Sequence, residues 1–282
     1  GDHRDLHSFP TRRSSDLFEL VVYNRSPEKL EPFRNRERVT TASSIEQLVE
    51  RSDTICTIIA DDQAMAEVVL GEGGIADSCR KHPKPRILID SSTIAPETSL
   101  RLAGELNRIG VDMLDAPVTG SLPQAEEGVL TFIVGGDEET YQKCLPLFEA
   151  MGKKAVYMGR QGAGASAKLA NNMLAAITLS GLAESLSLVR SCGGSPELFL
   201  EVVAGGGARS GMAEMKGPKM VKGDFSPQFK TKLMHKDLKL AARLAESVQM
   251  PAPVLNVAKE MFSAACQSGW GEEDMSAIVR NY

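Results

Sequence analysis

The hydrophobic pattern of this chain changes once, near residue 163. Before that point short β-rich runs alternate with helical segments, which is typical of βαβ units in a parallel sheet. Several runs are apolar on both faces, as buried parallel strands require. Strands are predicted at 18–23, 54–59, 87–90, 111–115, 130–134 and 155–158. After residue 163 the pattern predicts helices only. The fold class is therefore α/β, with a doubly wound parallel sheet followed by an all-α C-terminal domain.

Local signals place some of the helices. Ser43 or Ser44 suits an N-cap for a helix over 43–51, and Pro96 suits the first turn of a helix over 96–109. One unusually long helix follows residue 163 and should end at Gly193 or Gly194. Further helices are predicted at 196–203, 234–248 and 252–267. We place the domain boundary between residues 160 and 161, which gives domains of residues 18–160 and 161–282.

Composition excludes several classes of protein. The chain has 282 residues, 42% of them hydrophobic and 24% charged, which is typical of a globular protein with a sizeable core. Its net charge of -5 argues against nucleic-acid binding, and no apolar run reaches the length that a membrane span needs. The five cysteines are far apart and odd in number, which predicts reduced, packed thiols of a cytoplasmic protein. The histidines have no metal-ligand spacing, so no metal site is predicted.

The first seventeen residues differ from the rest. They show no apolar periodicity and run abruptly into the strand-like FELVVY. They lack the apolar core of a secretory signal, and their three aspartates count against a transit peptide. They resemble a translated sequencing adapter. We therefore expect residues 1–17 to be foreign to the fold or disordered.

The residues that follow the first predicted strand suggest a nucleotide contact. In a doubly wound sheet ligands lie beyond the carboxyl ends of the strands, where an acid would bind the ribose of NAD and an arginine the 2′-phosphate of NADP. Here Asn24, Arg25 and Ser26 stand at that place, without an acid. A guanidinium suits a phosphate, so the sequence favours NADP, with NAD as the other possibility. The alternative is a plain turn in which Ser26 caps the next helix.

Two later strands also end in polar segments. DSSTI at 90–94 brings hydroxyls that could meet a nicotinamide or a substrate, and simple helix capping is the alternative. DAPVTGS at 115–121 combines a stiff Pro117 with Gly120, which lets backbone approach a ligand closely. Its N–H groups and the Thr119 hydroxyl could hold a carboxylate. A rigid surface turn is the alternative for this segment.

Two motifs fall in the helical part. GRQGAGASAKLANN at 159–172 places Lys168 and Asn172 four positions apart, on one helix face. A lysine in a cleft beside a cofactor can have its pKa lowered and then exchange protons with a substrate. The alternative is a glycine-rich helix start with an exposed lysine. In HKDLKLA at 235–241, Lys236 and Asp237 could turn into a cleft or remain solvated.

Taken in chain order, these five motifs resemble those of the β-hydroxyacid dehydrogenase family, which includes 3-hydroxyisobutyrate dehydrogenase and the glyoxylate/succinic semialdehyde reductases. The resemblance covers roughly residues 18–282. It implies an NAD(P)-binding Rossmann domain and a helical domain for substrate binding and oligomerisation. It also implies reversible hydride transfer between a short β-hydroxy acid and its semialdehyde or oxo acid. Homodimers or homotetramers built through the helical domains are the expected assembly.

The resemblance assigns roles by motif position. Lys168 matches the catalytic lysine and Asn172 its substrate-orienting partner. The residues that match the substrate site are Thr119, Gly120, Ser121, Phe229 and Asp237. The residues that match or suit the cofactor site are Asn24, Arg25, Ser26, Thr93 and Lys236. Among them Thr119 stands where serine is commoner, and Phe229 matches an aromatic residue that closes the pocket.

One departure from the family pattern is large. The family begins with a strand and a G-x-G-x-x-G turn that holds the cofactor pyrophosphate. Here no glycine occurs between Gly1 and Gly71. We expect the first strand, its helix and the main phosphate site to be missing, with apolar surface exposed on the neighbouring strands. The alternative function is therefore a non-catalytic fragment that oligomerises through its helical domain.

Overall fold

The computed structural model describes residues 17–120 and 122–282. The expectations for residues 1–16 and for Ser121 lie outside these residues. The chain divides into two compact units, Gly1–Lys168 and Leu169–Tyr282. The domain boundary predicted between residues 160 and 161 stays a prediction.

The first unit contains a six-stranded sheet. Its order is β3-β4-β5-β7-β6, with β8 on the other side of β7. The pairs β3–β4, β4–β5 and β7–β8 are parallel, whereas β7 runs antiparallel to β5 and to the short β6. The strands are β3 (Thr54–Thr57), β4 (Arg86–Asp90), β5 (Val111–Asp115), β6 (Val118–Thr119), β7 (Leu130–Gly136) and β8 (Gly152–Gly159). Each predicted run from 54 onward overlaps one of these strands, and the α/β class is confirmed.

Helices connect the strands of this unit. They are η2 (Pro27–Phe33), α2 (Ile45–Glu50), α3 (Asp62–Leu70), α4 (Ile75–Lys81), α5 (Pro96–Asn107), α6 (Leu122–Glu126) and α7 (Glu138–Met151). Ser44 is the N-cap of α2 and accepts a hydrogen bond from Gln47 N at 3.1 Å. Pro96 is the first residue of α5. Both start signals are therefore used as predicted.

Packing covers both faces of the six-stranded sheet. Successive residues of a strand point to opposite faces, and they enter different hydrophobic clusters. Leu88 packs with buried residues of α3, α4 and α5, whereas Ile89 packs in a second cluster with Phe148 of α7. The same division separates Met113 from Leu114. Helices on both faces are what a doubly wound sheet requires.

A second, two-stranded sheet precedes the main one. It pairs β1 (Leu20–Val22) in parallel with β2 (Val39–Thr41). Within residues 17–120 and 122–282 no strand joins β1 to β3, so the two sheets are separate. All three residues of β1 are only partly buried. The expectation that a strand is missing between them stays a prediction.

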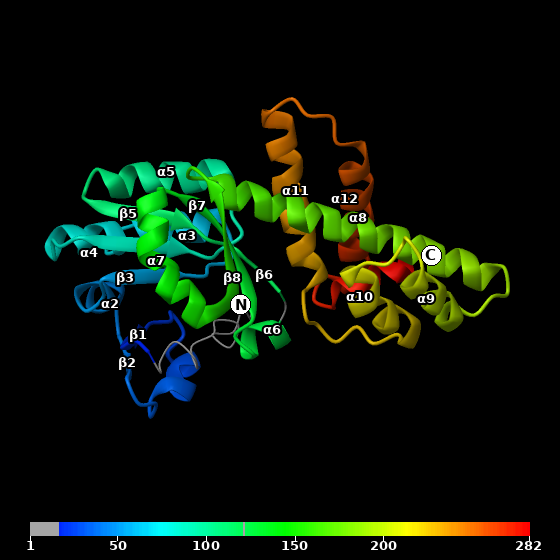
Figure 1. Cartoon of the computed structure of the whole chain (residues 1–282), viewed down its shortest axis with the longest axis horizontal. Helices are drawn as coiled ribbons and strands as arrows, with labels where there is room; N and C mark the ends of the chain where they lie inside the picture. Colours follow the sequence, from blue (N-terminus) through cyan, green and yellow to red (C-terminus); the bar gives the residue numbers. More distant parts are fainter. Residues whose placement is uncertain (1–16, 121) are drawn as a thin grey trace. The chain divides into compact units, whose positions relative to one another are not determined.

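The second unit is helical apart from one isolated bridge between Lys230 and Asp274. Its elements are α8 (Ala163–Ser191, which begins in the first unit), α9 (Pro196–Gly205), α10 (Gly211–Lys222), α11 (Thr231–Ser247), α12 (Pro253–Ala265), η3 (Cys266–Trp270) and η4 (Met275–Asn281). Helices α11 and α12 lie side by side in Figure 1 and contact one another. The long helix ends two residues before Gly193, as predicted, whereas α10 was not predicted.

Helix α8 bears on the expectation that no segment could span a membrane. It has 29 residues, and an 18-residue window of mean hydropathy 1.4 passes the test of length and composition. That part of the expectation was wrong. The central helix of a globular domain passes the same test, and Leu179, Ala183 and Leu186 of α8 are buried. One such helix is weak evidence for a membrane.

Candidate active site

Two buried aspartates stand at the carboxyl ends of neighbouring parallel strands. Asp90 ends β4, Asp115 ends β5, and the two are register partners. Each is 1% exposed. An aspartate that closes an apolar run is the sequence signal for both, but neither was singled out. Ligands of doubly wound sheets bind beyond this edge, so these residues lie where the first unit can form a site.

The Asp90 carboxylate organises the DSSTI segment. Its Oδ1 accepts hydrogen bonds from Thr57 Oγ1 at 3.0 Å and from Ser92 N and Oγ at 3.0 and 2.5 Å. Burial raises the pKa of Asp90, while these donors act in the opposite direction. Helix capping by this segment does not occur, because Ala95 is the N-cap of α5. Thr93 lies half-buried at the same edge.

The segment that begins at Asp115 is neither a surface turn nor a free loop. Val118 and Thr119 form β6 and pair with Phe132 and Thr131 of β7. Gly120 follows with a φ of +129°, a conformation that favours glycine. A Cβ there would also come within 2.7 Å of a Leu130 methyl carbon. Thr119 is therefore held on a short strand, next to exposed backbone.

The polar residues after β1 form a local turn. Asn24 Oδ1 accepts a hydrogen bond from Ser26 N at 2.8 Å. Ser26 is the N-cap of η2, but its side chain makes no capping hydrogen bond. Arg25 is exposed and makes no ion pair or hydrogen bond with any residue that the structure describes. Its guanidinium is thus available to a ligand at the end of β1.

In the second unit, α8 and α11 bring three of the predicted site residues together. Asn172 Nδ2 donates a hydrogen bond of 2.7 Å to Oδ2 of Asp237. Lys236 Nζ lies 3.1 Å from Oδ1 of Asp237. That contact is an ion pair without hydrogen-bond alignment, and Oδ1 has no hydrogen-bond donor among the described residues. Asn172 and Asp237 are 4% and 2% exposed, so this polar cluster is buried.

Lys168 lies one helical turn before Asn172 on α8. It is 8% exposed, so the alternative of a surface lysine does not hold. A buried lysine is uncommon unless it is paired or functional. Lys168 is therefore a paired or a functional lysine rather than a solvated one.

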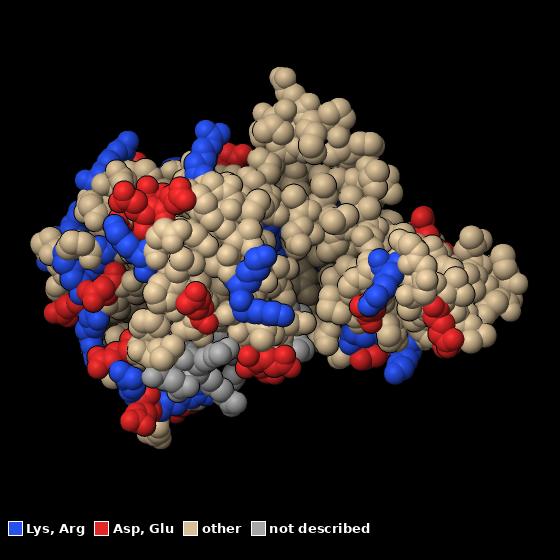
Figure 2. Space-filling view, viewed as in Figure 1, with Lys and Arg blue, Asp and Glu red and all other residues tan. Residues whose placement is uncertain are grey.

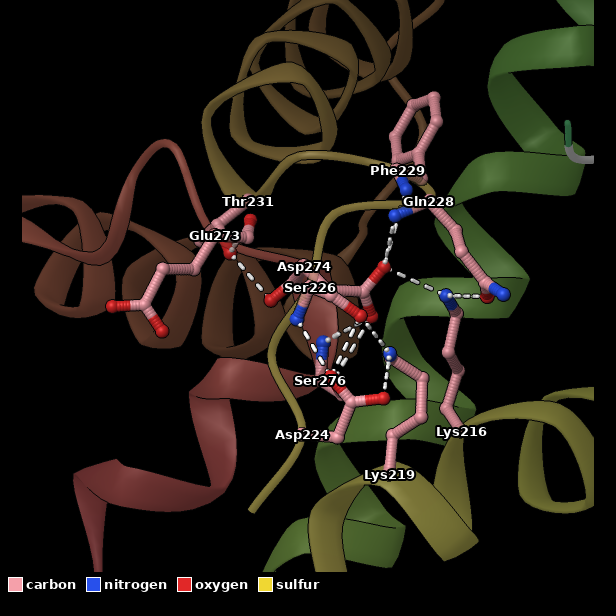
Figure 3. A network of polar contacts seen from close by, with 10 residues as sticks. All are labelled: Lys216, Lys219, Asp224, Ser226, Gln228, Phe229, Thr231, Glu273, Asp274 and Ser276. Carbon is pink, nitrogen blue, oxygen red and sulfur yellow. Dashed lines mark hydrogen bonds and ion pairs between the residues drawn. The ribbon is translucent and has the colours of Figure 1, made fainter.

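Phe229 lies in the loop before α11, and a network that the sequence did not reveal fixes that loop (Figure 3). Oδ2 of Asp274 accepts hydrogen bonds from Gln228 N at 3.0 Å, Phe229 N at 3.1 Å and Lys216 Nζ at 2.8 Å. Lys216 and Asp274 are buried, at 2% and 0% exposure. Burial opposes ionisation of Asp274, yet the Lys216 ammonium and the backbone donors hold its pKa below the usual value. The pKa of Lys216 is lowered by burial.

Comparison with known proteins identifies the family. Residues 11–159 match the NAD binding domain of 6-phosphogluconate dehydrogenase, and residues 162–282 match the family described as NAD-binding of NADP-dependent 3-hydroxyisobutyrate dehydrogenase. The chain is 35% identical over 235 residues to 2-hydroxy-3-oxopropionate reductase of Escherichia coli, covering 83% of this chain and 79% of the relative. It is 34% identical over 273 residues to mitochondrial 3-hydroxyisobutyrate dehydrogenase of Mus musculus, with coverage of 93% and 79%.

A solved structure agrees with this result. Psf3 in complex with NADP+ and 2-OPP superposes with a TM-score of 0.85 at 25% identity, covering 98% of this chain and 95% of that one. The chain belongs to the β-hydroxyacid dehydrogenase family. By class it is an NAD(P)-dependent oxidoreductase, with NADP or NAD as its cofactor.

The described residues fit part of such a cofactor. The exposed Arg25 suits a 2′-phosphate, and Oδ2 of Asp90 and Oγ of Ser91 are buried at the end of β4 without hydrogen-bond partners in the described part of the chain. No glycine-rich turn for a pyrophosphate occurs in residues 17–70. Across the described ranges no group of His, Cys, Asp and Glu could hold a metal ion.

Proposed function

We propose that this protein catalyses reversible hydride transfer between a short β-hydroxy acid and its semialdehyde or oxo acid. The substrate class is that of 3-hydroxyisobutyrate or of glyoxylate and succinic semialdehyde. The observation that carries this proposal is the burial of Lys168 one turn from Asn172, whose amide is bound to the buried Asp237. The names of the relatives, a reductase and a dehydrogenase of small hydroxy acids, support the same class.

Each site residue has its own role in the proposed reaction. The nicotinamide supplies or accepts the hydride. Lys168 Nζ donates a proton to the alkoxide oxygen that forms in reduction, and takes it back in oxidation. Asn172 orients that oxygen, and its own amide is held by Asp237. Thr119, Gly120 and the adjoining Ser121 bind the substrate carboxylate.

The cofactor contacts lie at the ends of strands and at the start of α11. Arg25, with Asn24 and Ser26 shaping its turn, binds the 2′-phosphate, so NADP is favoured over NAD. Thr93 and Lys236 complete the cofactor site. Phe229 closes the substrate pocket from the loop that Asp274 holds.

The assembly we propose is a homodimer or homotetramer formed through the second unit. Leu174 and Leu188 on α8 are 64% and 66% exposed, and Val254 and Val257 on α12 are also exposed. Figure 2 shows charged side chains over the first unit and over α9 and α10, while the drawn face of α11 and α12 is almost free of them. Exposed apolar side chains of this kind mark association surfaces.

We place the protein in the cytoplasm, with its cysteines reduced. All five cysteines are free thiols.

A second candidate function is a non-catalytic fragment that assembles without binding nucleotide. The separation of the β1–β2 sheet from β3, together with the lack of any glycine between Gly1 and Gly71, favours this alternative. A fluorescence titration with NADPH separates the two candidates. Saturable binding supports the enzyme, and no binding up to about millimolar NADPH supports the fragment.

A substrate panel tests the reaction itself. Purified protein is assayed with NADPH against glyoxylate, succinic semialdehyde, tartronate semialdehyde and methylmalonate semialdehyde. The reverse reaction is assayed with 3-hydroxyisobutyrate and NADP+. Turnover of at least one carboxylate substrate, and none of the matching aldehydes without a carboxylate, is the expected result. NADPH binding without turnover of any member would contradict the proposal.

A further inference from the structure

Helix α8 starts without a capping side chain of its own. It begins at Ala163, and Gly162 precedes it with a φ of +86°, a conformation that favours glycine. The first N–H groups of a helix have no partners within the helix, and an N-cap side chain usually binds the one three residues on. Glycine has no side chain to do this. The partner must therefore come from elsewhere in the fold.

The Asp115 carboxylate fills that place from 50 residues away. Its Oδ1 accepts a hydrogen bond from Gly162 N at 2.8 Å, and its Oδ2 accepts one from Ala165 N at 2.6 Å. Both oxygens are thus committed to the start of one helix. All three residues belong to the first unit, and charge-assisted bonds of this length are among the stronger ones.

Direct backbone contact also fixes the position of the first turn of α8. A Cβ on Gly164 would lie 2.4 Å from Ile133 O and 2.6 Å from Asp115 O, so the first turn of α8 touches the backbone of β5 and β7 directly. Lys168 is four residues after Gly164 and therefore lies on the same helix face, one turn further on. A shift or rotation of this first turn would move the lysine with it.

A buried carboxylate such as that of Asp115 is an unusual helix cap, because its desolvation costs free energy. Desolvation of its carboxylate, together with the nearby charge of Asp90, raises the pKa of Asp115 to about 6. The two backbone hydrogen bonds act in the opposite direction. Exposed caps such as Ser44 on α2 carry no such penalty. Asp115 is the first residue of the DAPVTG segment, and its carboxylate binds the start of α8. It is therefore placed to align this segment with the helix that carries Lys168.

We propose that Asp115 is the positioning residue for Lys168, acting through the first turn of α8. The inference rests on the role proposed above for Lys168. It adds a residue that touches neither substrate nor cofactor and sets the geometry of proton transfer. Misplacement of a reacting group by about 1 Å can cost about 10²-fold in rate.

The first test is Asp115→Asn, which keeps the shape but turns an amide group toward one of the two N–H donors. We expect kcat to fall by about 10-fold to 10²-fold, with the Kd for NADPH unchanged. Ser44→Ala is the matched control, because it removes an N-cap hydrogen bond of α2 in the same unit. It should lower Tm without changing kcat. An Asp115→Asn protein that melts earlier but keeps wild-type kcat would overturn the inference.

A second pair of variants keeps the test open if Asp115→Asn does not fold. Gly162→Ala and Gly193→Ala both place a Cβ at a positive φ, one at each end of α8, with no atom closer than 3.5 Å. The strain is similar, but only Gly162 contacts Asp115. We expect kcat to fall in Gly162→Ala alone. Equal kcat in the two variants would overturn the inference.

A double-mutant comparison separates this inference from the proposed function. In a Lys168→Met background, Asp115→Asn should cause no further loss of turnover, because the group it positions is gone. If Lys168→Met itself keeps wild-type turnover, the proposed function fails. If Lys168→Met lowers turnover and Asp115→Asn adds an independent loss, only the positioning role fails.

Discussion

Asn172 donates a hydrogen bond of 2.7 Å from its side-chain amide to Oδ2 of Asp237, and so joins α8 to α11 inside the second unit. Asn171 Nδ2 donates to Oδ1 of Asn172 at 3.2 Å, so both ends of the Asn172 amide are engaged. The amide is therefore held in one orientation. The residue proposed to orient the substrate oxygen is itself oriented by a buried carboxylate.

Asn172→Asp should replace this hydrogen bond with two facing carboxylates. Two like charges at this distance repel each other, so the pKa of one carboxyl group of the pair is raised and that group takes up a proton. We expect lower kcat and Tm at about pH 8 than at about pH 5.5, since the repulsion grows as the shared proton is lost. Thermal melts and rates across this range measure the effect. Asn256→Asp on α12, beside Lys259, is the control and should show no such dependence.

Arg25 should decide between the two cofactors. Its exposed guanidinium is proposed to bind the 2′-phosphate, which NADH lacks. Arg25→Gln should raise the Kd for NADPH by about 10-fold or more, corresponding to a lost charge-assisted contact, and leave the Kd for NADH unchanged. Arg34→Gln, which removes an arginine paired with Glu31, is the control. Equal weakening for both nucleotides would refute the 2′-phosphate assignment.

The buried pair of Lys216 and Asp274 should matter far more to stability than the neighbouring pair of Lys219 and Asp224, which Figure 3 also shows. Removing one partner of a buried pair leaves an uncompensated charge and costs about 3–5 kcal/mol. Lys216→Met should therefore lower the free energy of unfolding by about that amount, measured in urea. Lys219→Met should have little effect, because Asp224 is exposed. Similar midpoints for the two variants would contradict this view of the network.

Stability should carry a pH signature of Asp115. Its folded pKa of about 6 lies above the ordinary aspartate pKa of about 3.9, so the folded state holds the proton more tightly. The contribution is fully present below about pH 4 and is lost as pH rises through about 6, by about 3 kcal/mol in total. Wild type and Asp115→Asn are compared by urea unfolding from about pH 4 to about pH 7. The wild-type curve should fall relative to the variant, and parallel curves would contradict the assigned pKa.

Self-association should depend on the exposed leucines of α8. Leu174→Glu with Leu188→Glu places two charges on the proposed interface, where burial of unpaired charge is unfavourable. We expect a smaller hydrodynamic mass by analytical ultracentrifugation than for wild type. Leu100→Glu, at an exposed leucine of α5 in the first unit, is the control. A wild-type monomer would contradict the proposed assembly directly.

Strand positions followed from the sequence, because a strand buried on both faces leaves a short apolar run with clear ends. The run predicted at 111–115 is β5, Val111–Asp115, without any change of bounds. Helix α10 was not predicted, because Gly211, Gly217 and Pro218 interrupt its helical pattern of apolar residues. A Cβ on Gly217 would come within 2.7 Å of a Leu200 methyl carbon, so that glycine serves the packing of α9 on α10. Nothing local in the sequence reveals such a contact.

The site was predictable only as separate motifs. Helical spacing placed Lys168 near Asn172, but no local rule brings Asn172 to Asp237, 65 residues later. The same holds for Asp115 with Gly162 and for Lys216 with Asp274. Such pairs depend on tertiary packing. The sequence indicated only a glycine-rich helix start after residue 159, whereas the structure shows that Gly162 and Gly164 hold the first turn of the helix that carries the lysine.

The central claim is that Lys168 transfers the proton that accompanies hydride transfer. The most direct test is single-turnover oxidation of bound NADPH by the best substrate of the panel, followed by the near-ultraviolet absorbance of the reduced nicotinamide. Lys168→Met is compared with wild type, and Lys222→Met at the exposed end of α10 is the control. We predict a rate at least about 10²-fold lower for Lys168→Met, with an unchanged Kd for NADPH and a wild-type rate for Lys222→Met. A near-normal rate for Lys168→Met would contradict the account.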